Sequence, residues 1–346
     1  MGSVKKIGTE ELFRLKPDIP VVDVRTPDEY RHGHIPGAVQ IPLFDNNERA
    51  LIGKVYAHKG SDAAILLGLD IVGPRLRNYI EQAKKISPEH KIILYCWRGG
   101  MRSGSLAWLF STAGMECYVL EGGYKAYRRY VLASFQTPLK FIVLGGETGA
   151  GKSEILQQLA KQGEQILDLE QIACHKGSAF GAIGQPDQPT QEQFENNLFE
   201  VFRTLSQDKP VWIENESITI GKLFIPRSLF EQMEKSPVVC INRPFPERLE
   251  RLVREYAISD RETLTEIFRG LVRRLGSEKC QRAIEAVQEG KYDTAAEIAL
   301  HYYDKVYGRQ LEKKQPQIAK IFHINKSLNI NIQELITLGK ELIFSN

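Results

Sequence analysis

Two loops of this chain carry residues that could do chemistry, and each follows an apolar run typical of a buried strand. The first loop, Cys96–Ser103, comes directly after Lys91–Tyr95. The second loop, Gly146–Ser153, comes directly after Phe141–Leu144, about fifty residues further on. Both loops are rich in glycine and lead into helical patterns, so their backbone N–H groups can surround an anion. Few protein functions combine a cysteine loop and a phosphate loop in one chain.

The first loop predicts a reactive thiol. Gly99 and Gly100 allow the backbone to curl into a bowl of N–H donors around the sulfur of Cys96. Arg98 and Arg102 add full positive charges, which lower the pKa of a thiol and stabilise an anionic group bound to it. A buried structural cysteine is the alternative, but two arginines and two glycines within seven positions disfavour it. We therefore predict that Cys96, Arg98 and Arg102 are catalytic.

The second loop meets the full Walker A pattern, G-x-x-x-x-G-K-S, between a predicted strand and a predicted helix. Lys152 is expected to reach the terminal phosphates, and the Ser153 hydroxyl can hold Mg²⁺. The predicted phosphate-binding residues are Gly146, Gly149, Gly151, Lys152 and Ser153. No cysteine or histidine spacing predicts a separate protein metal site.

The Walker A pattern does not identify the molecule that carries the phosphates. A GTPase needs an Asn-Lys-x-Asp segment to read guanine, and Ile324–Leu328 has Leu328 in place of that Asp. GTP is therefore disfavoured. Asp168, Glu214 and Glu216 lie near the ends of predicted strands and are candidates for the acid that assists at the loop, although each could instead cap a loop.

From Val21 to about Tyr130 short apolar strands alternate with amphipathic helices, and a second series of strands and helices runs from Phe141 to Arg274. This pattern predicts helix-covered parallel sheets of the α/β class. The pattern breaks just before Pro138. We predict a first domain over residues 1–134, with an ordered insertion at about 43–73, and a second, P-loop NTPase-like domain over residues 138–346 with its Walker A motif at 146–153.

Composition narrows the class of protein. The 346 residues have a net charge of +3, which is compatible with nucleic-acid binding but does not establish it. Five scattered cysteines form no disulfide framework. No apolar run is long enough to span a bilayer, and the N-terminal residues resemble no secretion signal, so we expect a cytoplasmic protein without a membrane partner.

The first 130 residues or so resemble the rhodanese family of sulfurtransferases. The similar segments are Val22–Arg25 with Glu29–Tyr30, Gly33–Ala38 and Leu120–Tyr124. By this resemblance Cys96 would carry a persulfide or perselenide. The loop departs from the family because its C-x5-R spacing has one residue more than usual, which equals that of cysteine-dependent phosphatases and suits a larger oxyanion such as phosphate or selenophosphate. We interpret Asp23 and Arg25 as a buried ion pair, and His34 as a turn-capping residue.

A rhodanese-like domain followed by a P-loop domain resembles the tRNA 2-selenouridine synthase family. The further segments that carry this resemblance are Asn47–Gly53, His175–Gly181, Gln188–Gln191, Phe194–Asn196 and Trp212–Ser217. The resemblance implies a transferase that acts on tRNA with 2-thiouridine at the wobble position. It implies S-geranylation by geranyl diphosphate at the P-loop, then replacement of sulfur by selenium from selenophosphate through a Cys96 intermediate. A selenophosphate-producing enzyme would then be a partner.

Two alternatives stay open from the residues alone. One is a cysteine-dependent phosphatase or sulfurtransferase fused to an ATP-dependent kinase-like domain, although Tyr95 replaces the His that usually precedes a phosphatase cysteine. The other is a non-catalytic tRNA-binding module, which the intact loop residues disfavour. Basic residues that could contact tRNA phosphates are Lys125, Arg128, Arg129, Arg243, Arg248, Arg251 and Arg254. Interleaved glutamates favour a salt-bridged helix for the last four.

Overall fold

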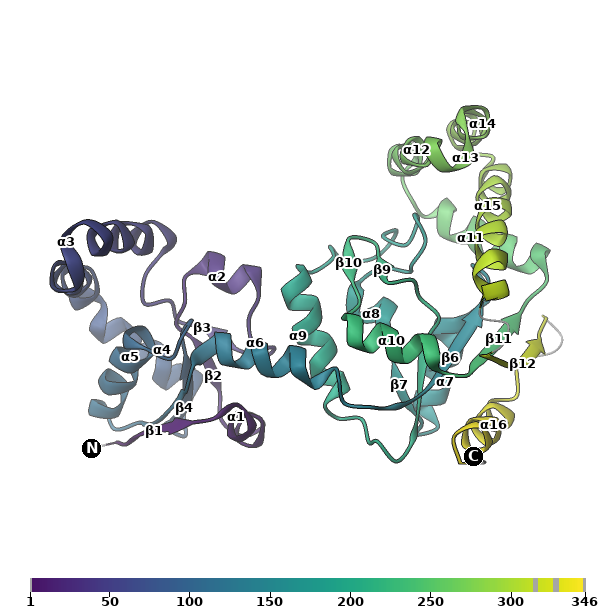
Figure 1. Cartoon of the computed structure of the whole chain (residues 1–346). Helices are drawn as coiled ribbons and strands as arrows, with labels where there is room; N and C mark the ends of the chain where they lie inside the picture. The colour runs from purple at the N-terminus through teal and green to yellow at the C-terminus, as the bar shows by residue number, and fades with distance from the viewer. Residues whose placement is uncertain (1, 314–316, 326–329, 345–346) are drawn as a thin grey trace. The chain divides into compact units, whose positions relative to one another are not determined.

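The computed structural model describes residues 2–313, 317–325 and 330–344. The chain divides into two compact units, one formed by residues 1–134 with 195–200 and the other by residues 135–194 with 201–346. Both units are built around parallel sheets with helices between successive strands (Figure 1). The predicted α/β class is therefore confirmed. No helix in these ranges is long and apolar enough to cross a membrane.

The first unit contains a five-stranded sheet in the order β1-β5-β4-β2-β3, and every neighbouring pair is parallel. Its strands are β1 (Val4–Ile7), β2 (Val21–Asp23), β3 (Val39–Gln40), β4 (Lys91–Tyr95) and β5 (Glu116–Leu120). Its helices are α1 (Thr9–Leu15), α2 (Pro27–His32), α3 (Asn46–Val72), a 3₁₀ turn (Gly73–Arg75), α4 (Leu76–Ile86), α5 (Met101–Thr112) and α6 (Gly123–Ser134). The four residues after Lys91 in β4 are buried, as expected for a central parallel strand covered on both faces.

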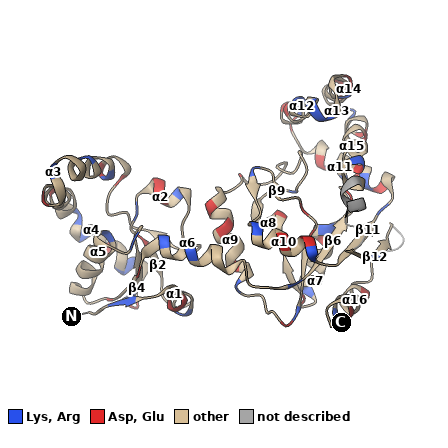
Figure 2. Cartoon of the chain, in the orientation of Figure 1, with Lys and Arg blue, Asp and Glu red and all other residues tan. Residues whose placement is uncertain are grey.

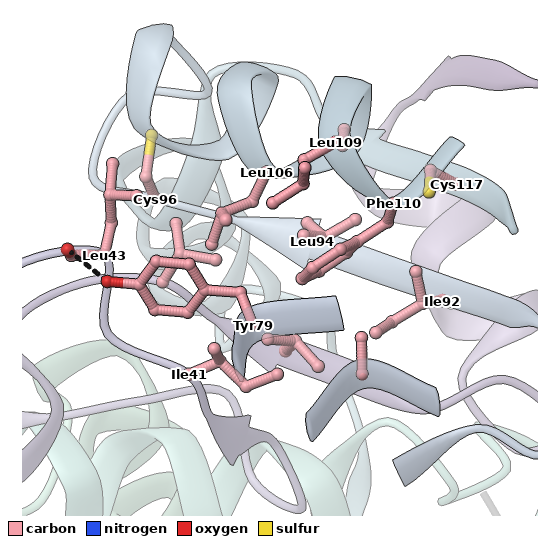
Figure 3. Close-up of a cluster of buried hydrophobic side chains, with 14 of the residues drawn as sticks. Ile41, Leu43, Tyr79, Ile92, Leu94, Cys96, Leu106, Leu109, Phe110 and Cys117 are labelled. Atoms are coloured by element: carbon pink, nitrogen blue, oxygen red, sulfur yellow. Dashed lines mark hydrogen bonds between the residues drawn. The ribbon is translucent and has the colours of Figure 1, made fainter. Parts of the chain in front are cut away.

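A hydrophobic core under the cysteine loop holds β4 against its neighbouring helices. Ile92 and Leu94 of β4 pack with side chains of α4 and α5 (Figure 3). The Tyr79 hydroxyl donates a hydrogen bond to the carbonyl oxygen of Leu43 at 2.9 Å and thereby fixes the chain entering α3. Figure 3 shows the Cys96 sulfur pointing away from Tyr79 and Leu94, so the core anchors the loop while leaving the thiol on the other side.

Helix α3 is the insertion between β3 and α4. Asp45 and Glu48 form a capping box that starts it, and Gly60, with φ 84° and ψ −176°, kinks it into two helical segments. Ala64 and Val72 of the second segment are buried. A strong apolar periodicity is missing because large apolar side chains also lie on the exposed side of this helix.

The second unit has a five-stranded parallel sheet in the order β12-β11-β6-β8-β7 and a small hairpin. Its strands are β6 (Lys140–Gly146), β7 (Gln165–Leu167), β8 (Pro210–Glu214), β9 (Thr219–Ile220), β10 (Leu223–Phe224), β11 (Val238–Asn242) and β12 (Ile318–His323). Its sheet-associated helices are α7 (Lys152–Lys161), α8 (Leu169–Ala173), α10 (Arg227–Lys235) and α16 (Ile332–Phe344). Helix α9 (Gln191–Phe202) starts and ends in this unit, but its residues 195–200 belong to the first unit. The central position of β6 puts the phosphate loop at the middle of the sheet edge where ligands of such folds bind.

Five further helices of this unit have a hydrophobic core of their own. They are α11 (Phe245–Ala257), α12 (Arg261–Gly270), α13 (Val272–Leu275), α14 (Ser277–Gln288) and α15 (Tyr292–Lys313). Phe180, from the loop after α8, packs into this core against Tyr256 and Phe268, with ring centroids 4.8 and 5.1 Å away. The loop after α8 is thus tied to the helices, which the sequence pattern does not predict.

Candidate active sites

The cysteine loop is shaped by its contact with the turn that follows β5. Backbone N–H groups of Tyr124 and Lys125 donate to the carbonyl oxygens of Cys96 and Trp97 at 2.9 and 3.0 Å. Gly99 has φ 63°, and a Cβ there would lie 2.5 Å from the carbonyl oxygen of Leu120, so only glycine fits. This contact explains why the Leu120–Tyr124 segment accompanies the cysteine loop in the sequence.

The sulfur of Cys96 accepts two hydrogen bonds inside the loop. The Ser103 hydroxyl donates at 3.2 Å and the Gly100 N–H at 3.3 Å. Burial raises the pKa of this thiol, but the hydrogen bonds from Ser103 and from the backbone N–H groups of the loop outweigh burial, so the pKa lies below its ordinary value. The loop geometry therefore makes this thiol easier to ionise than an ordinary cysteine. Ser103 belongs to the loop, but the sequence pattern alone did not single it out.

Replacing Ser103 with alanine should make Cys96 less reactive at neutral pH. Loss of one hydrogen bond to a charged sulfur is expected to slow alkylation by iodoacetamide about tenfold. The rate is measured against pH by mass spectrometry of the Cys96 peptide. Ser111→Ala is the control, because the Ser111 hydroxyl bonds the Trp108 carbonyl elsewhere on α5. An unchanged pH profile for Ser103→Ala would show that the hydroxyl does not tune the thiol.

All three predicted catalytic residues of the first unit, Cys96, Arg98 and Arg102, line one cavity of about 970 Å³. Arg98 is exposed. Arg102 makes a bidentate ion pair with Glu29, at 2.6 and 3.1 Å. That pairing positions the guanidinium and explains why Glu29 belongs to the sequence signature of this unit.

Asp23 and Arg25 form the predicted buried ion pair, with both side chains fully buried and 2.6 Å apart. The Tyr95 hydroxyl donates to Asp23 at 2.6 Å and links β4 to β2, while Arg25 also donates to the Gly33 carbonyl at 2.6 Å. Neither side chain lines the cavity beside Cys96. His34 bonds the Tyr30 carbonyl through Nδ1 at 2.9 Å, consistent with its predicted role in the turn.

The phosphate loop has the expected strand, loop and helix context, β6 to α7. All five predicted residues, Gly146, Gly149, Gly151, Lys152 and Ser153, line a second cavity of about 680 Å³. The Lys152 ammonium donates to the Gly146 carbonyl at 2.8 Å, and the Ser153 hydroxyl donates to Glu170 at 2.8 Å. Gly151 caps α7 with φ 92°, which points backbone N–H groups toward a bound anion.

Of the three candidate acids, the structure places only one in the cavity beside this loop. Asp168 caps α8 by accepting from the Gln171 N–H at 2.8 Å, which ends β7 at Leu167, and does not line the cavity. Glu214 is fully buried and accepts from the Leu169 N–H at 2.9 Å, away from the cavity lining. Glu216 lines the cavity, as does Glu170, which our sequence analysis missed. The only signal for Glu170 was its place two residues after Asp168.

Glu216 and Glu170 place two carboxyl groups close together in the cavity. Burial, followed by the Glu170 carboxylate, raises the pKa of Glu216 to about 8, and the Lys152 ammonium only partly offsets this. In the unfolded chain the pKa is near its ordinary 4.5. As the pH rises from about 4.5 to about 8, the unfolded chain releases this proton first, so the free energy of unfolding falls over that range.

Glu216→Gln should therefore stabilise the protein at high pH only. Gln cannot ionise, so we expect its melting temperature to exceed the wild-type value by roughly 5 °C at pH 9 and to match it at pH 5. Thermal unfolding at both pH values measures this. Glu231→Gln, in an exposed ion pair with Arg227, is the control. Equal shifts at pH 5 and pH 9 would contradict the protonation argument.

Part of the wall of this cavity is aromatic and apolar. Loop residues 175–181, which include Phe180, lie on one side, and α11 and α15 contribute the other apolar side chains. The lining side chains of this kind are Phe180, Leu252, Tyr256, Tyr302, Tyr303, Val306 and Tyr307. The cavity thus combines the phosphate loop with aromatic and apolar side chains, of which Leu252 and Tyr307 lie beside the loop.

Comparisons with known proteins give both units a family. Residues 139–330 match the tRNA 2-selenouridine synthase AAA domain, and residues 9–130 match the rhodanese-like domain. A tRNA 2-selenouridine synthase of Bordetella petrii is 36% identical over 341 residues, which cover 87% of this chain and 89% of that protein. One of Nitrosomonas europaea is 36% identical over 263 residues, or 73% and 68% of the two chains. The chain belongs to the tRNA 2-selenouridine synthase family.

Membership of this synthase family identifies the protein as an enzyme, which excludes the non-catalytic alternative. It also confirms the family resemblance over both units. A solved N-terminal domain from Clostridium difficile 630, of a protein described as ATP/GTP-binding, is 45% identical, with a TM-score of 0.35 over 38% of this chain and 99% of that one.

The basic residues considered for tRNA are mostly engaged within the protein. Arg243 and Arg254 pair with the interleaved Glu247 and Glu250, as predicted. Arg248 and Arg251 pair instead with acids elsewhere in the chain, namely Glu147 and Asp304 for Arg248 and Glu154 for Arg251. Arg128 pairs with Glu195, whereas Lys125 and Arg129 are exposed. Figure 2 shows basic and acidic residues interleaved over both units. Of the segment Ile324–Leu328, residues 326–328 lie outside the described residues.

Proposed function

We propose that this enzyme converts 2-thiouridine at the tRNA wobble position to 2-selenouridine, by S-geranylation and then exchange of sulfur for selenium. The observation that carries the proposal is the presence of two different anion sites in a member of this family: a thiol in a bowl of donors, and a phosphate loop that opens onto an aromatic wall. The wobble base visits the two sites in succession. A selenophosphate-producing enzyme is the expected partner and the cytoplasm the expected compartment.

The first step, S-geranylation, takes place at the phosphate loop. The loop N–H groups and Lys152 hold the diphosphate of geranyl diphosphate, and the isoprenoid chain lies along the aromatic wall. The thiocarbonyl sulfur attacks C1 of the geranyl group, a C–S bond forms, the C–O bond to diphosphate breaks, and the base loses its N3 proton. The positive charge of Lys152 stabilises the departing diphosphate. The base of a nucleotide would contact few of the apolar side chains in this wall.

The residues around Ser153 suit Mg²⁺ bound together with a diphosphate. The Ser153 hydroxyl and the Glu170 and Glu216 carboxylates are oxygen donors, and Mg²⁺ in such sites takes one or two carboxylates plus substrate phosphates. The described residues contain no cluster of three or more metal-binding side chains that would hold the ion without substrate. When bound, Mg²⁺ would neutralise charge on the diphosphate and offset repulsion from the two glutamates.

The second step, the exchange of sulfur for selenium, takes place at the cysteine loop. The bowl around Cys96 and the Arg98 and Arg102 charges hold selenophosphate. Attack by the Cys96 thiolate on phosphorus breaks the P–Se bond, leaves the phosphoryl group on sulfur and releases hydrogen selenide. Selenide attacks C2 of S-geranyl-2-thiouridine, the C–S bond breaks and geranyl thiol leaves. Water then removes phosphate from Cys96, so the sequence needs no added oxidant or reductant.

Omitting one co-substrate at a time tests this order. Without geranyl diphosphate, pure protein and selenophosphate should leave 2-thiouridine RNA unchanged. RNA that already carries S-geranyl-2-thiouridine should be selenated without geranyl diphosphate. Nucleoside mass analysis reads both outcomes. Selenation of 2-thiouridine in the absence of geranyl diphosphate would refute the two-step sequence.

A further inference from the structure

The cavity that contains Cys96 is much larger and more apolar than a selenophosphate site requires. Its volume of about 970 Å³ lies at the upper end of small-molecule sites, whose usual range is about 300–1,000 Å³. One wall is the α3 insertion with the chain before it, and the other is the cysteine loop. The apolar side chains that line it are Leu43, Phe44, Ile52, Tyr56, Ala64, Ile65, Leu69, Val72, Trp97 and Met101.

Several of these side chains are left unusually exposed. Leu69 is 61% exposed, Tyr56 60% and Met101 68%. A contiguous group of large apolar side chains in contact with water is unfavourable and marks a surface that binds an apolar ligand. They surround a thiol whose sulfur points away from the core (Figure 3), so the ligand and the reacting sulfur share one space.

The ligand must therefore combine an apolar group with a reacting polar part. The cysteine loop contributes the polar groups of Cys96, Arg98 and Arg102 to the cavity, and α3 contributes most of its apolar side chains. Selenophosphate has no apolar group, and neither does 2-thiouridine. In the reaction sequence proposed above, S-geranyl-2-thiouridine is the reactant that carries a hydrocarbon chain on the sulfur to be displaced.

We propose that α3 and the cysteine loop form a second isoprenoid pocket, which binds the geranyl chain of S-geranyl-2-thiouridine and places C2 of the base at the Cys96 loop. This inference rests on the proposed function. The chain is thus recognised twice, once as a diphosphate ester in the P-loop unit and once as a thioether in the rhodanese-like unit. The second recognition makes selenation selective for the intermediate over unmodified 2-thiouridine.

A protection experiment on the full-length protein tests the pocket. The probes are two chemically prepared anticodon stem-loop RNAs, one with S-geranyl-2-thiouridine and one with 2-thiouridine. At equal concentration, the geranylated RNA should slow iodoacetamide alkylation of Cys96 at least about tenfold more than the other RNA, since burial of each CH₂ group contributes to affinity. Equal protection by the two RNAs would overturn the proposal.

A pair of matched variants on α3 makes the test specific. Leu69→Asp puts a charge into the cavity, whereas Leu66→Asp puts the same charge on the same helix at a residue that is 64% exposed and does not line the cavity. Leu69→Asp should remove the extra protection and slow selenation of geranylated RNA about tenfold, and Leu66→Asp should do neither. Because both leucines are exposed, both variants should keep the wild-type melting temperature. Identical behaviour of the two variants would refute the pocket.

The design separates this inference from the proposed function, because the geranylated RNA is supplied and not made by the enzyme. Selective protection without any enzymatic geranylation would refute the two-step function but keep the pocket. Geranylation without selective protection would keep the function and refute the pocket. If Leu69→Asp impairs only selenium supply from an added selenophosphate-producing enzyme, with protection intact, the surface binds that protein and the proposal fails.

Discussion

Cys96→Ala is expected to abolish 2-selenouridine formation, by at least about a hundredfold, while S-geranylation of 2-thiouridine stays largely intact. In the proposed function the Cys96 thiolate takes part only in the second step, whereas geranyl diphosphate binds the phosphate loop of the other unit. S-geranyl-2-thiouridine should accumulate. Nucleoside mass analysis of RNA incubated with both co-substrates measures the two products together.

Cys117→Ala is the matched control for Cys96→Ala. Cys117 lies buried in β5 of the same unit, and burial raises the pKa of its thiol to about 12, so it cannot supply a thiolate at neutral pH. This control should form 2-selenouridine at a rate close to that of the wild type. If Cys96→Ala loses geranylation as completely as selenation, the division of labour between the two loops is wrong.

Lys152→Ala is expected to slow S-geranylation about 10²–10³-fold, the usual cost of removing a group that stabilises developing negative charge. The ammonium is already placed at the loop by its hydrogen bond to the Gly146 carbonyl. Lys161→Ala, at the exposed far end of the same helix, should have little effect. The rate is measured from 2-thiouridine RNA and geranyl diphosphate.

RNA that already contains S-geranyl-2-thiouridine should bypass the Lys152→Ala defect, because selenation needs only the cysteine loop. Loss of selenation on this RNA would show that Lys152 serves both steps. Hydrolysis of ATP or GTP in proportion to product would count against a prenyl diphosphate as the phosphate-loop ligand.

The sequence predicted those parts of the sites that are local in the chain. An apolar strand followed by a glycine-rich loop gives the position of Cys96 and of Lys152, because the residues that mark such a loop are adjacent in the sequence. The Asp23–Arg25 pair was also predictable, since only one residue separates the two oppositely charged side chains in the chain.

The missed features depend on contacts between segments far apart in the chain. Glu170 meets Ser153 only because β7, β8 and β6 are ordered as they are in the sheet. Phe180 forms part of the aromatic wall because its loop packs on helices about eighty residues later. The contribution of α3 to the cavity beside Cys96 was missed because its large apolar side chains lie on several sides of the helix, which weakens the helical periodicity of the sequence.

A time course of nucleosides from a single incubation tests the central claim most directly. Pure protein, 2-thiouridine RNA, geranyl diphosphate and selenophosphate are mixed, and the three nucleosides are quantified by mass spectrometry. The two-step account predicts that S-geranyl-2-thiouridine rises first and falls as 2-selenouridine appears, with a lag in the final product. Formation of 2-selenouridine without a lag, while S-geranyl-2-thiouridine persists unconsumed, would contradict it.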